Sequence, residues 1–78
     1  MISMRLKNVI LKTLELSEFD LQDDTHAYQV PGWDSLSHIV VITAIEKEYR
    51  IRFKLPEILR LNNLSDLQML INKKTNAF

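Results

Sequence analysis

Hydrophobic residues recur along this chain mainly at steps of three and four, the spacing that places side chains on one face of an α-helix. The first such stripe consists of Ile2, Leu6, Val9, Ile10 and Leu14. Basic and amide side chains fall on the remaining faces of the same segment, as in a helix with one buried side. The pattern therefore predicts a helix over about residues 3–16.

A second helix is predicted over residues 35–49, beginning at Asp34 or Ser35. The residues expected on one of its faces are Ile39, Ile42, Ile45 and Tyr49. Its middle is apolar on nearly every side, because Val40, Val41 and Ala44 occupy the other faces. A helix that is apolar all round has neighbours on several sides, so this helix is predicted to be central.

Two shorter helices are predicted over residues 56–61 and 64–72. Pro56 suits the first turn of the former, where a missing N–H costs nothing. Asn63 is a suitable N-cap for the latter, whose expected buried stripe is Leu64, Leu67, Leu70 and Ile71. The alternation of Ile51 and Phe53 with basic residues is interpreted as an extended connection, and the chain from about Asn72 as a frayed tail.

Residues 17–34 lose the helical period and are predicted to form a long connection. The acidic residues in and around it are Glu15, Glu18, Asp20, Asp23, Asp24 and Asp34. Long loops within small domains are often functional. The whole chain, 1–78, is thus interpreted as a single all-α domain with four helices, a long first loop and a short third helix.

Composition excludes several classes of protein. Ten basic and ten acidic residues give a formal net charge of +0, which disfavours nucleic acid and anionic membranes as partners. The absence of cysteine excludes disulfides and thiolate zinc sites. A chain of 78 residues is too short for a deep enclosed active site. No apolar run approaches the roughly 20 residues of a membrane span, and basic residues interrupt residues 1–16 where a signal peptide would be apolar. A cytoplasmic protein is expected.

The segment that precedes the second helix carries the candidate chemistry. Pro31-Gly32 is typical of the centre of a type II turn, so the chain is expected to reverse just before the helix begins. Asp34 is a natural N-cap for the free N–H groups of Leu36 or Ser37.

The residues on either side of Asp34 have predicted places of their own. Trp33 precedes the cap, where it is expected to pack on the fourth helical residue, His38. Ser35 falls at the first helical position with its hydroxyl outward. The amide groups and the helix dipole favour a phosphate ester there.

The surrounding pattern resembles the acyl carrier proteins over nearly the whole chain. The segments that carry the resemblance are Gly32-Trp33-Asp34-Ser35-Leu36, Ile45-Glu46-Lys47-Glu48-Tyr49, Ile51-Arg52-Phe53 and Asn63-Leu64-Ser65-Asp66-Leu67. The resemblance implies a four-helix bundle of acyl-carrier type. It also implies that a phosphopantetheinyl transferase moves 4′-phosphopantetheine from coenzyme A onto Ser35, using Mg²⁺ that the transferase mainly holds. The domain would then be a monomeric carrier of thioester-linked intermediates, with no catalytic activity and no metal of its own.

The chain departs from the familiar fatty-acid carriers in its charge. Those carriers are strongly acidic and present an acidic second helix to basic enzymes, whereas this chain is neutral. The residues expected to contact partner enzymes are Leu36, Ser37, Val40, Thr43 and Lys47, followed by Arg50, Arg52 and Lys54. A carrier of acyl or aminoacyl groups for a specialised pathway is therefore favoured, such as polyketide, nonribosomal peptide or surface-saccharide modification.

Other interpretations of the same residues remain open. The strongest is a helical interaction module that docks a partner through Val40 and Val41 and is never modified. A second treats Asp34, Ser35 and His38 as a catalytic constellation, although the chain is short for an oxyanion site and a substrate cleft. His26 lies beside acidic residues but lacks a second nitrogen or sulfur ligand at metal-binding spacing, so a solvated loop residue is expected.

Overall fold

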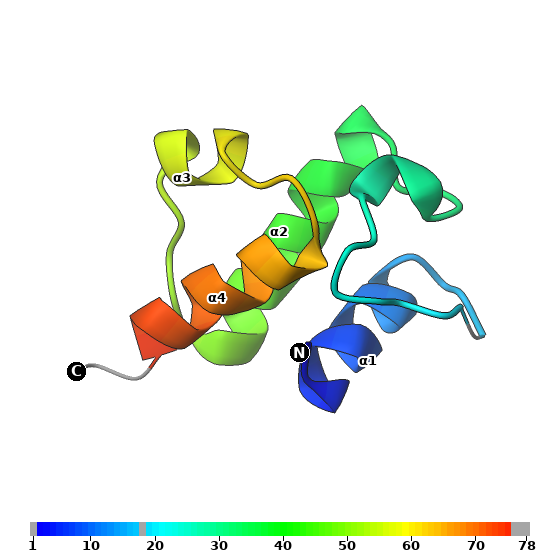
Figure 1. The fold of residues 1–78 in the computed structure, drawn as a ribbon, viewed down its shortest axis with the longest axis horizontal. Helices are drawn as coiled ribbons and strands as arrows, with labels where there is room; N and C mark the ends of the chain where they lie inside the picture. Colours follow the sequence, from blue (N-terminus) through cyan, green and yellow to red (C-terminus); the bar gives the residue numbers. More distant parts are fainter. Residues whose placement is uncertain (1, 18, 76–78) are drawn as a thin grey trace.

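The computed structural model describes residues 2–17 and 19–75, and in this part of the chain all regular structure is helical (Figure 1). The helices are α1 (Met4–Thr13), η1 (Ala27–Gln29, a 3₁₀ turn), α2 (Ser35–Tyr49), α3 (Leu55–Leu59) and α4 (Leu64–Thr75). The predicted all-α class with four α-helices, a long first connection and a short third helix is confirmed. Glu18 of the predicted acidic loop and the end of the predicted frayed tail, residues 76–78, lie outside the described residues.

α1 begins as its pattern predicts but ends three residues earlier than predicted. Its start is capped by Ser3, whose hydroxyl accepts from the N–H of Leu6. Its end is closed by Glu15, which adopts a left-handed conformation with φ 57°. The N–H of Leu16 then donates back to the carbonyl of Leu11 at 2.9 Å, as in a Schellman motif. The helical spacing of apolar residues continues to Leu14, so the sequence pattern did not indicate that the helix ends at Thr13.

α2 has the predicted bounds and is central, but one residue of its predicted apolar face is exposed. Val41, Ile42 and Ile45 are buried, and α1 packs against this helix. Ile39 is 65% exposed, so it does not share the burial of Ile42 and Ile45, the residues with which the sequence places it on one face. At about 100° per residue, Ile39 lies on the same side of α2 as Ser35, and no other described helix covers that side. In the sequence alone, an apolar residue there cannot be distinguished from a core residue.

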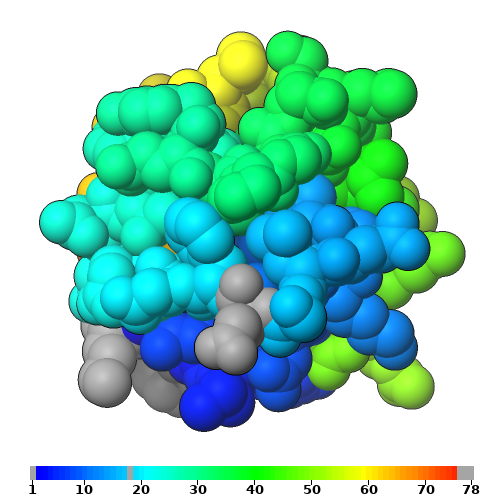
Figure 2. All heavy atoms as spheres, turned by 90° about the vertical axis from the view of Figure 1, so that its right-hand side faces the viewer, coloured from blue at the N-terminus to red at the C-terminus, as the bar shows by residue number. Residues whose placement is uncertain are grey.

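The connection between α1 and α2 is held against α4 by backbone hydrogen bonds. The N–H groups of Leu64 and Ser65 donate to the carbonyls of Thr25 and Asp23 at 3.0 and 2.8 Å. The Asp23 carboxylate accepts from the N–H of Ile2 at 2.9 Å, a bond that lowers the pKa of Asp23. Figure 2 shows this connection, light blue to teal, spread over the surface beside α1 in blue. The long loop therefore has fixed positions before α2.

α3 and α4 complete the bundle. α3 ends at Leu59 rather than at the predicted 61, and α4 continues to Thr75 rather than stopping at the predicted 72. Asn63 is confirmed as the α4 cap, since its side-chain oxygen accepts from the N–H of Asp66 at 2.9 Å. An ion pair of 2.9 Å between Glu57 and Lys74 joins the two helices. Residues 51–54 form neither helix nor strand, as expected for a connection.

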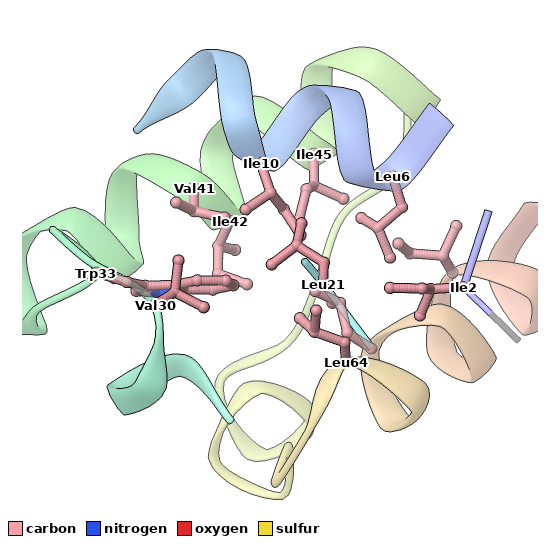
Figure 3. Packing of buried hydrophobic residues seen from close by; sticks show 12 residues of the cluster. Ile2, Leu6, Ile10, Leu21, Val30, Trp33, Val41, Ile42, Ile45 and Leu64 are labelled. Carbon is pink, nitrogen blue, oxygen red and sulfur yellow. The ribbon is translucent and has the colours of Figure 1, made fainter. Parts of the chain in front are cut away.

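The core is a single cluster to which every α-helix except α3 contributes fully buried side chains. Its buried hydrophobic members are Ile2, Leu6, Ile10, Leu21, Val30, Trp33, Val41, Ile42, Ile45, Leu64, Leu67 and Ile71. Figure 3 shows the Trp33 ring lying beside Val30 and Ile42, at the end of this cluster from which α2 begins. The Trp33 side chain thus packs the start of α2 against the core.

Candidate functional site

A tight turn directs the chain into α2. The N–H of Trp33 donates to the carbonyl of Val30 at 3.1 Å, and Gly32 between them has φ 82°. A positive φ at the third residue of the turn, directly after a proline at the second, defines the predicted type II turn. Any side chain at position 32 would be strained at this angle. The turn therefore fixes where the next helix starts.

Asp34 caps α2, as the sequence predicts. Its backbone is extended, and its side-chain oxygen accepts from the N–H of Ser37 at 2.8 Å. Its carbonyl accepts from the N–H of His38, also at 2.8 Å. Hydrogen bonds from the Ser37 N–H and then from the Ser37 side chain, followed by further backbone N–H groups, lower the pKa of Asp34 below its ordinary value of 3.8. The carboxylate is consequently charged at neutral pH, directly beside Ser35.

Trp33 and His38 form a pair beneath the cap. The indole Nε1–H donates to Nδ1 of His38 at 3.0 Å, and the two rings stack with centroids 6.0 Å apart. Only 7% of Trp33 is exposed. The predicted packing of His38 on Trp33 is confirmed. Among the described residues no hydrogen bond joins His38 to Ser35, so the alternative catalytic constellation is not assembled.

Ser35 is the first residue of α2 and is exposed. Within residues 2–17 and 19–75 its hydroxyl makes no hydrogen bond, and its neighbour Leu36 is 75% exposed. Figure 2 shows the first part of α2, in green, at the surface above the connection. The hydroxyl is therefore free to react, at the end of a helix where backbone N–H groups and the dipole stabilise a phosphate.

One face of α2 continues from Ser35 without a covering element. Thr43 and Lys47 are exposed on it, as predicted, and Val40 is 51% exposed. Ser37 is only half-buried and serves mainly as the donor to Asp34. Sequence reasoning missed Ile39, which lies four residues after Ser35 on the same face. The four-residue spacing from Ser35 could have indicated that Ile39 shares its face of the helix.

A small apolar cavity lies below the Trp33–His38 pair, between α2 and the start of α4. Its volume is about 40 Å³. The lining residues are Ala27, Trp33, His38, Ile42, Leu61, Asn62, Asn63, Leu64 and Leu67. This space holds little more than one water molecule, whose share of liquid volume is about 30 Å³. A larger guest would require α2 and α4 to move apart.

His26, the residue considered as a metal ligand, interacts within its own turn. The His26 ring stacks on Tyr28 with ring centroids 5.1 Å apart, and the His26 backbone N–H donates to the side-chain oxygen of Gln29. The described part of the chain contains no group of three or more histidine, cysteine, aspartate or glutamate residues arranged to hold a metal ion. None of the helices in that part combines the length and the apolar character that crossing a bilayer requires.

One of the comparisons with known proteins finds a similar structure. No family model matches the sequence, and no curated protein does. A search of solved structures finds a solution NMR structure of a holo acyl carrier protein from Geobacter metallireducens, with a TM-score of 0.86 and 33% sequence identity. The match covers 92% of this chain and 83% of that one. At 33% identity over 92% of this chain, the likeness extends from the fold to the sequence.

Proposed function

The chain belongs to the acyl carrier protein family, and from this premise we propose that Ser35 is the attachment site of a 4′-phosphopantetheine group. The 78 residues would act as one carrier domain, without catalysis of their own, and as a monomer. The group, when bound, supplies a terminal thiol that holds an acyl or aminoacyl unit as a thioester. The holo state of the similar protein supports this proposal.

The observation that carries the proposal is the exposed, unbonded hydroxyl of Ser35 at the start of α2. In the proposed modification, the Ser35 oxygen attacks the phosphorus that joins phosphopantetheine to the nucleotide of coenzyme A. The new oxygen–phosphorus bond replaces the bond to 3′,5′-ADP, which leaves. The serine proton passes to a base of the transferase. Every bond that changes lies outside the helix, so the fold need not open.

Asp34 and Trp33 have positioning roles in this proposal. The Asp34 carboxylate holds the first turn of α2 through Ser37 and places a negative charge beside the incoming phosphate, where the transferase's Mg²⁺ is needed. Trp33 is buried below the same turn and hydrogen-bonded to His38, which keeps the start of α2 from shifting. The serine is thus presented on a rigid base, as an attachment site requires.

The uncovered face of α2 is proposed as the recognition surface for the transferase and for acyl- or aminoacyl-loading and transferring enzymes. Its residues are Leu36, Ser37, Val40, Thr43 and Lys47, to which the structure adds Ile39. The face is apolar near Ser35 and basic at its far end. Because enzymes of general fatty-acid synthesis are expected to read an acidic face, a specialised biosynthetic pathway in the cytoplasm is proposed.

The test is the intact mass of the purified protein after incubation with coenzyme A, Mg²⁺ and a broad-specificity phosphopantetheinyl transferase. We expect one phosphopantetheine adduct on the wild type, none on Ser35→Ala and one on the control Ser17→Ala, which removes an exposed serine hydroxyl away from α2. An unmodified wild type that is folded would support the unmodified interaction module instead. Modification of Ser35→Ala would show that the attachment site lies elsewhere.

A further inference from the structure

The end of α2 farthest from Ser35 carries a cluster of cations. Lys47, Arg50 and Arg52 are exposed, and none of them forms an ion pair within residues 2–17 and 19–75. Arg50 adopts a left-handed conformation with φ 56°, which turns the chain sharply after Tyr49. The turn brings Arg52 back beside Lys47, since both line one groove. We call Lys47, Arg50 and Arg52 the basic groove.

The basic groove is a concave space lined by positively charged side chains and one carboxylate. Its volume is about 320 Å³, and its lining residues are Thr43, Glu46, Lys47, Arg50, Ile51 and Arg52. Exposed cations that face open water are usually a solvated surface. Here three of them surround one concave space together with a threonine and an isoleucine, so a group that enters the groove would meet charge and apolar contact together.

The nearby carboxylates are already occupied. Glu46 accepts from the N–H of Phe53 at 2.8 Å, which ties it to the backbone of the connection. Glu48 accepts from the guanidinium of Arg5 at 2.8 Å on the side of α1. Arg5 also donates to the Glu48 carbonyl. The three cations of the groove therefore face a single carboxylate, that of Glu46, and the groove is positive.

The groove lies at a fixed distance from Ser35 on one straight helix. Lys47 lies twelve positions after Ser35, and at a rise of about 1.5 Å per residue this is about 18 Å along the helix axis. Between them lie the exposed apolar residues Leu36, Ile39 and Val40. A protein interface of standard size covers about 800 Å² per partner, which is about 30 Å across. An interface of this width that includes Ser35 and extends along α2 is therefore long enough to reach the groove as well.

We propose that the basic groove receives carboxylate side chains of the phosphopantetheinyl transferase that modifies Ser35, and so selects an enzyme with an acidic docking surface. The proposal rests on the proposed function, because it assumes that Ser35 is modified. The transferase would contact the apolar strip near the serine and place its carboxylates about 18 Å away along α2. Charge of this kind raises the association rate and excludes enzymes with basic docking surfaces.

The test uses the transferase from the native host and measures kcat/KM for modification between low and high salt. Lys47→Glu/Arg52→Glu reverses two charges of the groove. Lys12→Glu/Lys73→Glu is the matched control, with the same change of net charge on exposed residues of α1 and α4. We expect the groove variant to lose at least tenfold in kcat/KM at low salt, mainly through KM, and the control to change less than twofold. The wild-type rate should fall as salt rises, and that of the groove variant should not.

The outcomes separate this proposal from the one on which it rests. Equal losses in both double variants would reflect net charge alone, and no loss in either would leave the groove without a role. Each result overturns the groove proposal while wild-type modification still supports Ser35. An unmodified wild type would overturn the proposed function itself. Sedimentation with vesicles containing phosphatidylserine is a further control. Binding that Lys47→Glu/Arg52→Glu abolishes, with modification unaffected, would assign the groove to a membrane and overturn the enzyme partner.

Discussion

Val40 and Val41 are adjacent in the sequence, but the structure gives them opposite surroundings. Val41 is 0% exposed inside the bundle, whereas Val40 is 51% exposed on the uncovered face of α2. Truncating each to alanine removes the same two methyl groups and changes helix propensity in the same direction. The pair Val40→Ala and Val41→Ala therefore separates packing from recognition without changing charge.

The expected costs follow from burial. For Val41, two methyl groups at about 0.8 kcal/mol each give a transfer term of about 1.6 kcal/mol. The cavity left behind, about 50 Å³, adds up to about 1.2 kcal/mol at about 24 cal/mol per Å³. Val41→Ala should thus cost about 2–3 kcal/mol, a large share of the roughly 4–12 kcal/mol typical of a domain of this size. Val40→Ala should cost about 0.5 kcal/mol or less.

Thermal unfolding followed by circular dichroism and the rate of phosphopantetheine transfer are the two assays. At about 4–8 °C per kcal/mol, Val41→Ala should lower Tm by about 8–24 °C and Val40→Ala by only a few degrees. Below the unfolding range, Val41→Ala should be modified at nearly the wild-type rate. Val40→Ala should lose about fivefold in kcat/KM, as expected for about 1 kcal/mol of lost contact with the enzyme.

Two results would refute this reasoning. If Val40→Ala destabilised the fold as much as Val41→Ala, the uncovered face of α2 would be packed against other parts of the chain. If Val41→Ala slowed modification at a temperature where it is fully folded, while Val40→Ala did not, the enzyme would read a different side of the helix.

Further predictions concern Tyr49, Asp34 and acid. The Tyr49 hydroxyl is buried and has no hydrogen-bond partner among the described residues. Tyr49→Phe should therefore raise the free energy of unfolding, measured by urea titration, by about 1 kcal/mol. A decrease in the free energy of unfolding would mean that the hydroxyl is hydrogen-bonded. Asp34→Asn keeps an oxygen for the cap but removes the charge, so it should retain most of the wild-type Tm and slow modification. Asp34→Ala should lower both the Tm and the rate of modification. An unimpaired rate in both variants would make Asp34 purely structural. Because the folded-state pKa of Asp34 is lowered, its contribution to stability is complete above about pH 5 and is lost as pH falls through the folded pKa. As pH falls below about 5, the Tm of the wild type should therefore decrease more steeply than that of Asp34→Asn; parallel curves would contradict this.

Much of the fold could be predicted from the sequence because its signals are local. The bounds of α2 followed from Asp34 and the apolar period, and the start of α4 from Asn63. The end of α1 could not be predicted, since Glu15 takes a left-handed conformation that glycine usually marks. Arg50 is a second such case, and its turn is what assembles the basic groove.

The site was predictable in its centre and less so at its edges. Asp34, Ser35 and the Pro31-Gly32 turn have short-range causes, so their placement at the start of α2 was accessible from the sequence. The exposure of Ile39 depends on which sides of α2 its neighbours cover, which is a property of tertiary packing. For the same reason, the pairing of Glu48 with Arg5, 43 residues away, could not be foreseen.

The most direct test is tandem mass spectrometry of the protein isolated from its native host, with the peptide that contains Asp34 and Ser35 sequenced. The account predicts that this peptide carries phosphopantetheine on the Ser35 oxygen, and that fragmentation releases the pantetheine portion. A peptide found entirely unmodified, in cells whose other carrier proteins bear the group, would contradict it.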